Sequence, residues 1–436
     1  LSIFIKLGID PLSGARAIRA IAFAIIIFFV GKLTYGASKS LWAAFFASCF
    51  VLFSSTAVLI HSFVLTEPSF IVFALSSFIM LALYFKLNKF YLFFISALLA
   101  SLSILDRYVG VSVIPTGIMC ILLWEKGIII ARIKKSFLFG VVSMFPISLW
   151  LIHNYLIAGT FTDRIFSFHL ITLDNIFLFF ITLSEWVVPY WHNIFIGILF
   201  LVFIITVLVV CIKQRTKLFK EATTTEVFYL RIIDILIIFI IFYLFFIFFS
   251  TSFFDALTPF NYRILAPVYF SIIIVLASIV PRFIKNIYFT VAISLLCLIS
   301  IAYGTYIITI INSQGLGFTK ESITSSSVGA EILSIPKEST IYTNVPHMVY
   351  VLSKRLSYMF PQKQNPHAII LNDEYKNEFD KMIRGIEQGN SYILYITMSD
   401  FYDPRMQMPT LDEIKSAFSS DIVERVTEDA TVFYRE

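Results

Sequence analysis

The sequence predicts an α-helical membrane protein that crosses the bilayer many times and ends in a soluble α/β domain. Three observations predict this fold class. Of 436 residues, 58% are hydrophobic and 14% are charged, long apolar stretches recur up to residue 311, and the chain turns polar after that point. A soluble domain is nearer one half apolar and one quarter charged. We therefore expect a transmembrane domain over 1–311 and a soluble domain over 312–436.

Ten stretches are apolar enough to be read as membrane spans, each of which needs about 20 mostly apolar residues. They cover 15–34, 41–60, 68–85, 90–105, 109–124, 137–155, 193–212, 232–250, 264–281 and 287–311. Residues 1–14 read as the end of an outer loop, with a Pro-Leu-Ser-Gly turn at 11–14. The chain begins with Leu, so we expect a first span and its outer loop to precede it.

The segment 174–191 (DNIFLFFITLSEWVVPYW) is too interrupted by polar residues to read as a span. We interpret it as a helix lying in the outer interface, capped by Asp174 or Asn175. An eleventh span is the alternative, but it would place the basic loop 213–231 outside the cell.

The basic residues define the topology, because Lys and Arg collect in cytoplasmic loops. Alternate connections hold most of them: Lys32, Lys39, Lys86, Lys89, Lys126, Arg132, Lys134, Lys135, Lys213, Arg215, Lys217, Lys220, Arg231, Arg282 and Lys285. The other connections hold Arg107, Arg164 and Arg263 with Glu67, Asp106, Asp163, Asp174, Glu185 and Asp255. This asymmetry predicts a multi-pass protein of the cytoplasmic (inner or plasma) membrane, with an extracytoplasmic C-terminal domain.

Charge and cysteine content exclude two classes of function. Residues 312–436 hold 12 Lys and Arg against 17 Asp and Glu, so this acidic tail is a poor nucleic-acid binder. The basic excess of residues 1–311 is explained by loop orientation. All four cysteines fall inside predicted spans, which favours packing over a disulfide framework or a metal site.

The tail shows strand and helix signals in alternation. STIYTN (339–344), RLSYMF (355–360) and SYILYIT (391–397) are rich in β-branched and aromatic residues and predict strands. The run 373–389 predicts an amphipathic helix that ends at Gly389, and 410–420 predicts another that is capped by Thr410. IVERV (422–426) and TVFYR (431–435) predict an antiparallel pair.

Polar residues that could carry chemistry gather at the outer ends of the predicted spans. They are Glu67, Arg107, Tyr108, Asn154, Arg164, Tyr262 and Arg263. Arginine presents a planar fork of donors that matches phosphate, so this set suits a lipid-linked phosphate or pyrophosphate. The alternative is that each residue is an interfacial anchor or part of a loop ion pair. His61, His153, His169 and His192 have no metal-site spacing, and Asp234 reads as a boundary residue paired with Arg231.

The chain resembles bacterial membrane glycosyltransferases of the C-type (GT-C) superfamily, in the branch that holds protein O-mannosyltransferases and aminoarabinose transferases. Five runs carry the resemblance in order: GARAIRAIAFAII (14–26), LTEPSFIVF (65–73), LDRYVGVSVIP (105–115), HNYLIAGTFTDR (153–164) and NYRILAPVY (261–269). The tail adds IYTNVPHMVYVLSKRLSYMFP (341–361). The chain departs from the family at His153, where Arg is frequent, and at 262–264, where Arg-Tyr-Leu is frequent.

The resemblance implies a sugar donor on a polyprenyl phosphate, bound from the outer side, and transfer to a glycan, lipid or protein acceptor. The family's main catalytic carboxylate lies in the first outer loop, which this chain lacks, so Glu67 is the remaining acidic candidate. Arg107, Tyr108, Asn154, Arg164, Tyr262 and Arg263 are the expected donor-binding residues. Arginines or a divalent metal ion would stabilise the departing phosphate.

Two other classes of function stay open. A transporter or translocase of lipid-linked sugars would show internal repeats and charges at mid-membrane. A non-catalytic membrane assembly factor would show an exposed apolar stripe on its tail.

Overall fold

The computed structural model describes residues 4, 6–162, 164–283, 287–365, 367–398, 407–418 and 422–435. Asp163 and Lys285, two charges considered above, lie outside this part of the chain. The chain divides into two compact units. The membrane unit comprises 1–163, 170–252 and 258–308, and the tail unit comprises 164–169, 253–257 and 309–436.

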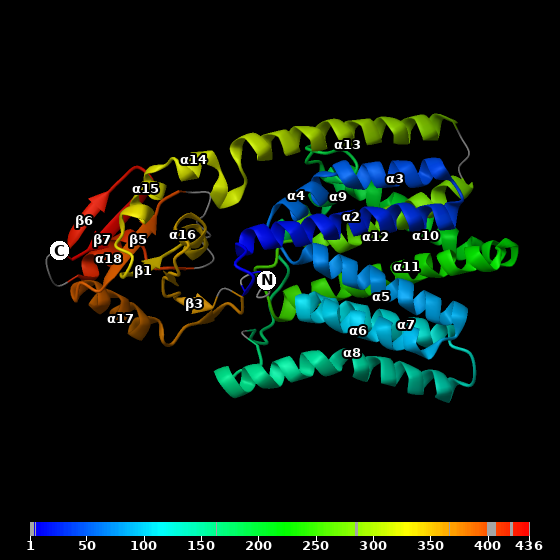
Figure 1. Cartoon of the computed structure of the whole chain (residues 1–436), viewed down its shortest axis with the longest axis horizontal. Coiled ribbons are helices and arrows are strands. Elements are labelled where there is room, and N and C mark those ends of the chain that lie inside the picture. Colours follow the sequence, from blue (N-terminus) through cyan, green and yellow to red (C-terminus); the bar gives the residue numbers. More distant parts are fainter. Residues whose placement is uncertain are drawn as a thin grey trace. The chain divides into compact units, whose positions relative to one another are not determined.

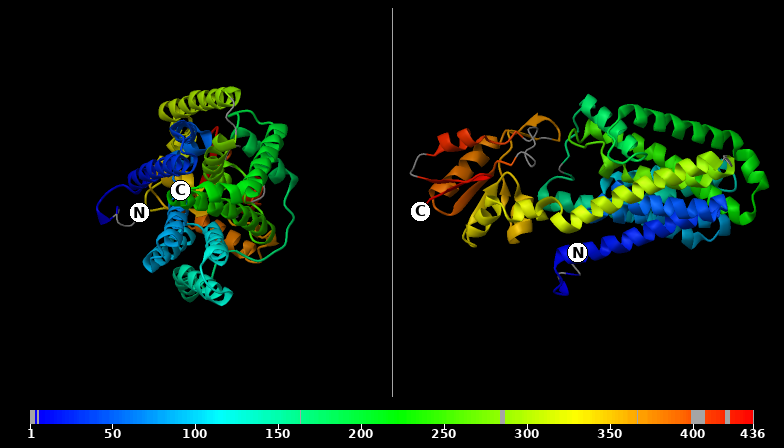
Figure 2. Two further views of the ribbon diagram at one scale, coloured as in Figure 1. Left: turned by 90° about the vertical axis from the view of Figure 1, so that its right-hand side faces the viewer. Right: turned by 90° about the horizontal axis from the view of Figure 1, so that it is seen from above.

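The membrane unit is a bundle of helices that run alongside one another (Figure 1; Figure 2, left, shows them end-on). In chain order they are α2 (Pro11–Ser38), α3 (Leu41–Phe53), α4 (Ser55–Ser62), α5 (Glu67–Leu87), α6 (Phe90–Asp106), η1 (Tyr108–Ser112), α7 (Val113–Trp124), α8 (Ile129–Ala158), α9 (Leu173–Glu185), α10 (Ile194–Glu221), α11 (Thr224–Phe253), α12 (Tyr262–Phe283) and α13 (Ile287–Gln314).

Helices cover the ten predicted apolar stretches, although 41–60 is divided between α3 and α4 and 109–124 between η1 and α7. The prediction of a helical protein with several helices of membrane-spanning length is confirmed. Within the described residues, seven helices are long and apolar enough to cross a membrane: α2, α5, α8, α10, α11, α12 and α13. An eighth is added if α3 and α4, which meet at a 50° bend, count as one span. The apolar helices at 90–106 and 108–124 are shorter, so the number ten stays a prediction.

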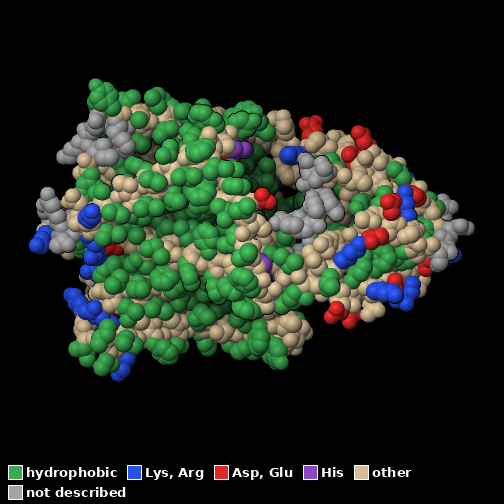
Figure 3. All heavy atoms as spheres, turned by 180° about the vertical axis from the view of Figure 1, so that it is seen from behind, with side chains coloured by type: hydrophobic (Ala, Val, Ile, Leu, Met, Phe, Trp, Pro, Cys, Tyr) green, Lys and Arg blue, Asp and Glu red, His purple; other side chains and the backbone are tan. Residues whose placement is uncertain are grey.

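The surface of the membrane unit suits a lipid environment. Figure 3 shows apolar side chains over the face of the unit seen there, with Lys and Arg side chains gathered at one end. Buried aromatic rings hold α5 to α11, since the Phe78 and Phe239 ring centroids are 5.1 Å apart and those of Phe70 and Tyr243 are 6.2 Å apart. Such ring pairs add to the stabilisation from area burial alone.

Two predicted helix starts were wrong. Helix α2 begins at Pro11, so Pro-Leu-Ser-Gly is its first turn rather than a loop turn, and Asp10 caps it by accepting a hydrogen bond from the Ser13 N–H at 2.9 Å. Helix α9 is capped by Thr172, whose hydroxyl accepts from the Asn175 N–H, and not by Asp174 or Asn175. Proline is favoured at the first helical position, and Thr is one of the residue types that favour the N-cap.

The tail unit is a sheet covered by helices on both faces. Its helices are η2 (Gly317–Thr319), α14 (Glu321–Thr324), α15 (Ser327–Ser334), α16 (Pro346–Ser353), α17 (Tyr375–Glu387) and α18 (Leu411–Ala417). Its strands are β1 (Thr340–Thr343), β2 (Tyr358–Met359), β3 (Gln364–Asn365), β4 (Ile370–Leu371), β5 (Ser391–Ile396), β6 (Val423–Val426) and β7 (Ala430–Tyr434). Strands β3 and β4 pair separately from the main sheet.

The main sheet has the order β2-β1-β5-β7-β6, with β2, β1 and β5 parallel and β7 and β6 antiparallel to their neighbours. Side chains alternate between its faces, as strand geometry requires. On β5, Leu394 joins a core with α15 and α16, whereas Ile393 joins a second core with α17 and α18. The two cores make this a three-layer α/β/α arrangement.

Most tail predictions are confirmed. Strands β1 and β5, helix α17 followed by Gly389, and the antiparallel pair β6–β7 lie where the sequence placed them. Thr410 caps α18 in a capping box with Glu413. The predicted strand at 355–360 shortens to two residues, and helices α14, α15 and α16 were not predicted because they are too short to show a clear period.

Candidate functional site

Glu67 lies at the centre of a polar cluster at one end of the membrane unit. We call this the Glu67 end: the end at which α5 and α12 begin and α6 stops. Glu67 is the first residue of α5, and its side chain has no exposed surface. A carboxylate in the first turn of a helix is favoured by the helix dipole.

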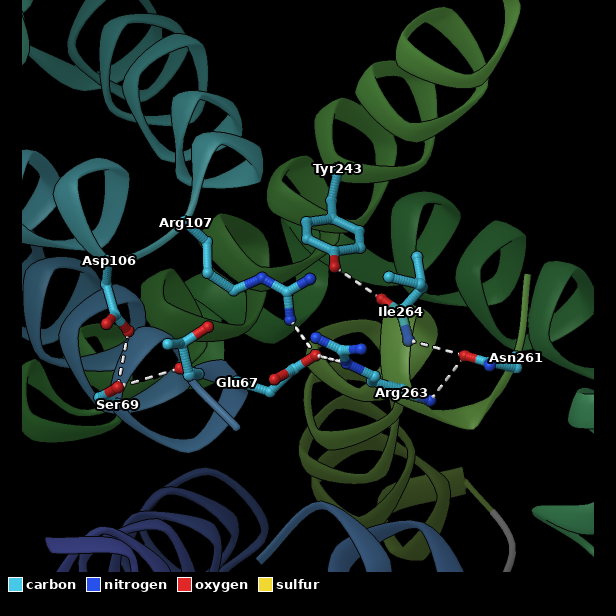
Figure 4. A network of polar contacts seen from close by, with 9 residues as sticks. Glu67, Ser69, Asp106, Arg107, Tyr243, Asn261, Arg263 and Ile264 are labelled. Atoms are coloured by element: carbon cyan, nitrogen blue, oxygen red, sulfur yellow. Dashed lines mark hydrogen bonds and ion pairs between the residues drawn. The ribbon is translucent and has the colours of Figure 1, made fainter. Parts of the chain in front are cut away.

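Two arginines converge on one oxygen of Glu67 (Figure 4). Arg107 follows the last residue of α6 and forms an ion pair with Glu67 Oε1 through its Nη1. Arg263, in the first turn of α12, donates from Nε to the same oxygen. The side chain of Arg107 is 16% exposed and that of Arg263 is 45% exposed, so the cluster reaches the surface through Arg263.

The backbone around the arginines is fixed by side-chain hydrogen bonds. Asn261 Oδ1 accepts from the N–H groups of Arg263 and Ile264 at 3.1 and 3.2 Å, which is the pattern of a helix N-cap. The Tyr243 hydroxyl of α11 donates to the Ile264 carbonyl at 2.6 Å. The first turn of α12, which carries Arg263, is therefore held by its own N-cap residue and by a hydrogen bond from α11.

A second carboxylate of the cluster is turned away from the arginines. The Ser69 hydroxyl donates to Asp106 Oδ2 at 2.6 Å and links the start of α5 to the end of α6. Both guanidinium groups thus contact Glu67, and among the described residues no other side chain accepts a hydrogen bond from them. Because a guanidinium group has five N–H donors, most donors of this pair remain for a ligand.

The other oxygen of Glu67, Oε2, is buried and has no hydrogen-bond partner among the described residues. A buried, unpaired carboxylate oxygen carries an unrecovered desolvation cost. Such atoms in a native structure need an explanation, and a role in ligand binding is one. The cluster therefore has both donors and an acceptor to offer.

The remaining predicted site residues fall in different places. Tyr262 is half-buried at the start of α12, within electrostatic reach of Arg263, Glu185 and Glu67. Tyr108 opens η1 next to Arg107, and 47% of its surface is exposed. Asn154, on α8, donates to the Phe161 carbonyl at 3.5 Å and is not part of the Glu67 cluster.

Arg164 belongs to the tail unit, where it pairs with Asp255 at 3.1 Å. Asp255 also bonds Nδ1 of His367 at 2.8 Å, and the Ala256 N–H donates to the His367 carbonyl at 3.0 Å. The two connecting segments 164–169 and 253–257 are in this way bound into the tail unit. The structure therefore does not assign Arg164 to the Glu67 cluster.

Two further side chains with buried, unpaired nitrogen atoms were not predicted as site residues. Arg19 of α2 is 4% exposed, its Nε donates to the Ala15 carbonyl at 3.1 Å, and its Nη1 has no partner among the described residues. His61 of α4 stacks on Phe23 at 4.2 Å and its Nε2 is likewise unpaired. The signal was available, because an ionisable residue inside an apolar helix is by default a functional candidate.

The opposite end of the membrane unit holds structural ion pairs. Glu125 accepts from Tyr84 at 2.7 Å and from Lys135 at 2.8 Å. Burial alone would raise the pKa of Glu125, but these hydrogen bonds outweigh it and lower the pKa. Asp234 pairs with Arg215 at 2.9 Å rather than with Arg231, which instead faces the Phe85 ring at 5.6 Å.

No group of three or more His, Cys, Asp or Glu side chains within the described residues is arranged to hold a metal ion. The four cysteines are free thiols inside helices of the membrane unit. The cluster at Glu67 thus offers two guanidinium groups, which can bind an anion, and one carboxylate, which can accept a hydrogen bond or a proton.

No family model matches the chain, and a search of curated proteins gives no significant match.

Proposed function

We propose that the chain transfers a sugar from a polyprenyl-phosphate donor to an acceptor on the outer side of the membrane, with Arg107 and Arg263 binding the donor phosphate. One observation carries the proposal: two guanidinium groups meet on a single buried oxygen of Glu67, at the end of an apolar helical bundle. The sequence resemblance to C-type membrane glycosyltransferases supports the same function.

The geometry suits an anion attached to a lipid. Glu67 holds the two guanidinium groups together at the cost of one donor from each, and their combined charge exceeds that of Glu67. A phosphate oxygen can then accept from both forks, and charge-assisted bonds of this kind are among the strongest hydrogen bonds in proteins. The apolar helix surfaces around the cluster provide a place for a polyprenyl chain.

The reaction would be a displacement at the anomeric carbon. The acceptor hydroxyl oxygen forms the new bond to that carbon and its proton passes to Glu67 Oε2, while the bond from carbon to phosphate oxygen breaks and its electron pair leaves with the phosphate. Arg107 and Arg263 stabilise the charge that develops there. Glu67 Oε2, unpaired in the cluster, is placed to accept a hydrogen bond from a sugar or acceptor hydroxyl.

Binding of undecaprenyl phosphate to the full chain in nanodiscs tests the proposal. Arg107→Gln and Arg263→Gln should each weaken binding by roughly 10- to 100-fold, since a hydrogen bond to a charged group is worth about 1.5–3 kcal/mol. Arg263→Lys should restore part of the loss, because Lys lacks the planar fork. Arg231→Gln, at the opposite end, is the control, and equal affinity in all variants would refute the proposal.

The transporter alternative retains one supporting observation. Arg19 lies inside an apolar helix with an unpaired, buried guanidinium nitrogen, which is the kind of residue that ion and substrate pathways use. Product analysis separates the two functions: a transferase releases free polyprenyl phosphate in the presence of acceptor, whereas a translocase returns the intact sugar lipid on the other leaflet.

A further inference from the structure

A carboxylate–imidazole pair lies where α9 leads into α10, and it takes no part in the proposed binding of phosphate. Glu185, the last residue of α9, bonds Nε2 of His192 at 2.8 Å. The Glu185 side chain is 23% exposed and that of His192 is 58% exposed. With Nε2–H donating to the carboxylate, Nδ1 of a neutral imidazole is an acceptor that faces no partner among the described residues.

Tyr190 sits beside this pair in a strained backbone conformation. Its φ is +69°, in the left-handed region where a bulky residue is an outlier. The loop is held by Ser184, whose hydroxyl donates to the Trp191 carbonyl at 2.9 Å and accepts from the Asn193 N–H at 3.3 Å. Residues kept in such conformations cluster at ligand sites, and 75% of Tyr190 is exposed.

Further aromatic rings extend this surface. The Tyr190 ring centroid lies 5.9 Å from that of His192 and 6.1 Å from that of Tyr303 on α13. The backbone that carries Tyr303 is fixed, because the next residue, Gly304, packs so closely on the Phe53 carbonyl oxygen that no Cβ would fit. The tyrosines thus stand on two backbone segments that are held by close contacts.

Tyr262, which immediately precedes Arg263 in the sequence, relates this group of residues to the Glu67 cluster. The Tyr262 hydroxyl is within electrostatic reach of both Glu185 and Glu67, and the Tyr303 hydroxyl is within reach of Glu185. Burial raises the pKa of Glu185, while His192 acts in the opposite direction. All these residues belong to the membrane unit, so their proximity is internal to one compact body.

We propose that Tyr190, Tyr303, Glu185 and His192 form a subsite that binds a carbohydrate, with a pyranose ring stacked on the exposed tyrosine face and a hydroxyl bound to the carboxylate–imidazole pair. Its assignment as the subsite of the sugar acceptor rests on the proposed function, in which the Glu67 cluster holds the donor. Aromatic faces are electron-rich and match the C–H face of a pyranose, while carboxylate and imidazole match its hydroxyls.

A belt of aromatic residues at the membrane interface is the alternative explanation, and it would account only for the exposure of the tyrosines. It does not account for the left-handed backbone of Tyr190 or for the carboxylate–imidazole pair beside it. The two explanations also predict different effects of substitution. A belt residue acts on membrane insertion and stability, whereas a carbohydrate platform acts on the binding of a water-soluble sugar.

Saturation-transfer NMR on the full chain in nanodiscs tests the subsite. The probes are methyl glycosides of glucose, mannose, galactose and N-acetylglucosamine, with glycerol as a polyol that lacks a pyranose face. We expect transfer to the ring C–H protons of at least one glycoside. Tyr190→Gly, which suits a φ of +69° and should fold, is expected to weaken this binding by about tenfold or more.

Two further variants sharpen the test. His192→Ala should weaken glycoside binding, and Phe195→Ala, which removes a 75% exposed ring in the first turn of α10, should leave it unchanged. The subsite is refuted if no glycoside receives saturation in the wild type or if Tyr190→Gly binds as the wild type does. If glycosides bind but undecaprenyl phosphate does not, the carbohydrate site is confirmed. The proposed function, and with it the role of this site as acceptor subsite, is then refuted.

Discussion

Arg263 and Glu67 are 196 residues apart in the sequence, yet the Arg263 Nε donates to Glu67 Oε1. Arg107 reaches the same oxygen from the end of a third helix. Three helices of the membrane unit are therefore joined at one carboxylate, which makes Glu67 a structural residue as well as a candidate for chemistry.

Replacing Glu67 should destabilise the bundle more than replacing Arg263. Glu67→Gln leaves Arg107, 16% exposed, without its counter-charge, and we expect a loss of about 1–3 kcal/mol in unfolding free energy. Arg263→Gln should cost less, about 0–1 kcal/mol, because the Arg263 side chain is 45% exposed and Glu67 keeps Arg107. Thermal unfolding in one detergent measures both, and the reverse order would show that the network does not stabilise the fold.

Gly304 should be intolerant of a methyl group. An added Cβ would overlap the Phe53 carbonyl oxygen, which is backbone and cannot rotate away, so Gly304→Ala should cost about 1–3 kcal/mol. Gly140→Ala is a matched control in α8, because its Cβ would make an ordinary contact, 3.5 Å from Ile118 Cδ1. Helix propensity predicts that this control gains up to about 1 kcal/mol. Equal effects of the two substitutions in a thermal melt would contradict the packing argument.

Cysteine labelling tests the topology. In a variant without the four native cysteines, Glu338→Cys in the tail unit should react with an impermeant maleimide in intact cells. Lys126→Cys, in the connection between α7 and α8, should react only after permeabilisation. Both positions are exposed, so access depends on the membrane alone. The opposite pattern would invert the orientation predicted from the basic loops.

The tail should lose stability in acid partly through Glu413. Hydrogen bonds from Lys363 and from the Thr410 backbone lower the pKa of Glu413 below its ordinary 4.5. A lowered folded-state pKa stabilises the fold above about pH 4.5, and this contribution is lost as the pH falls through the lowered value. Urea unfolding of residues 309–436 should show a smaller acid-induced loss for Glu413→Gln, which keeps the capping box.

The difference is expected to stay below about 1 kcal/mol, since the Glu413 and Lys363 side chains are 44% and 34% exposed. Asp412→Asn, one residue earlier in the same helix turn, is the control for a general loss of negative charge. An identical acid profile for the wild type and Glu413→Gln would exclude the contribution.

The sequence predicted features that depend on local pattern. Apolar length located the helices of the membrane unit, β-branched runs located β1 and β5, and Thr410 marked the start of α18. The candidate residues Glu67, Arg107 and Arg263 were found one by one from their position at helix ends. Their convergence on one oxygen depends on which helices pack together, and no local pattern encodes that.

The wrong predictions have the same origin. Asp234 was paired with Arg231 because the two are close in sequence, but the helix packing brings Arg215 to it. Arg19 was passed over because its helix reads as an ordinary apolar span, and its burial within the packed helices appears only in three dimensions.

The position of β7 determines when the tail unit can fold. This strand is the last in the chain, yet it lies between β5 and β6 and contributes to both cores of the unit. During synthesis, β5 therefore has one open edge and β6 has no partner until residues 430–434 have been made. Long-range pairing of this kind is slow and leaves unpaired edges exposed. The sheet edges of the tail unit thus stay open to aggregation until residues 430–434 have left the ribosome.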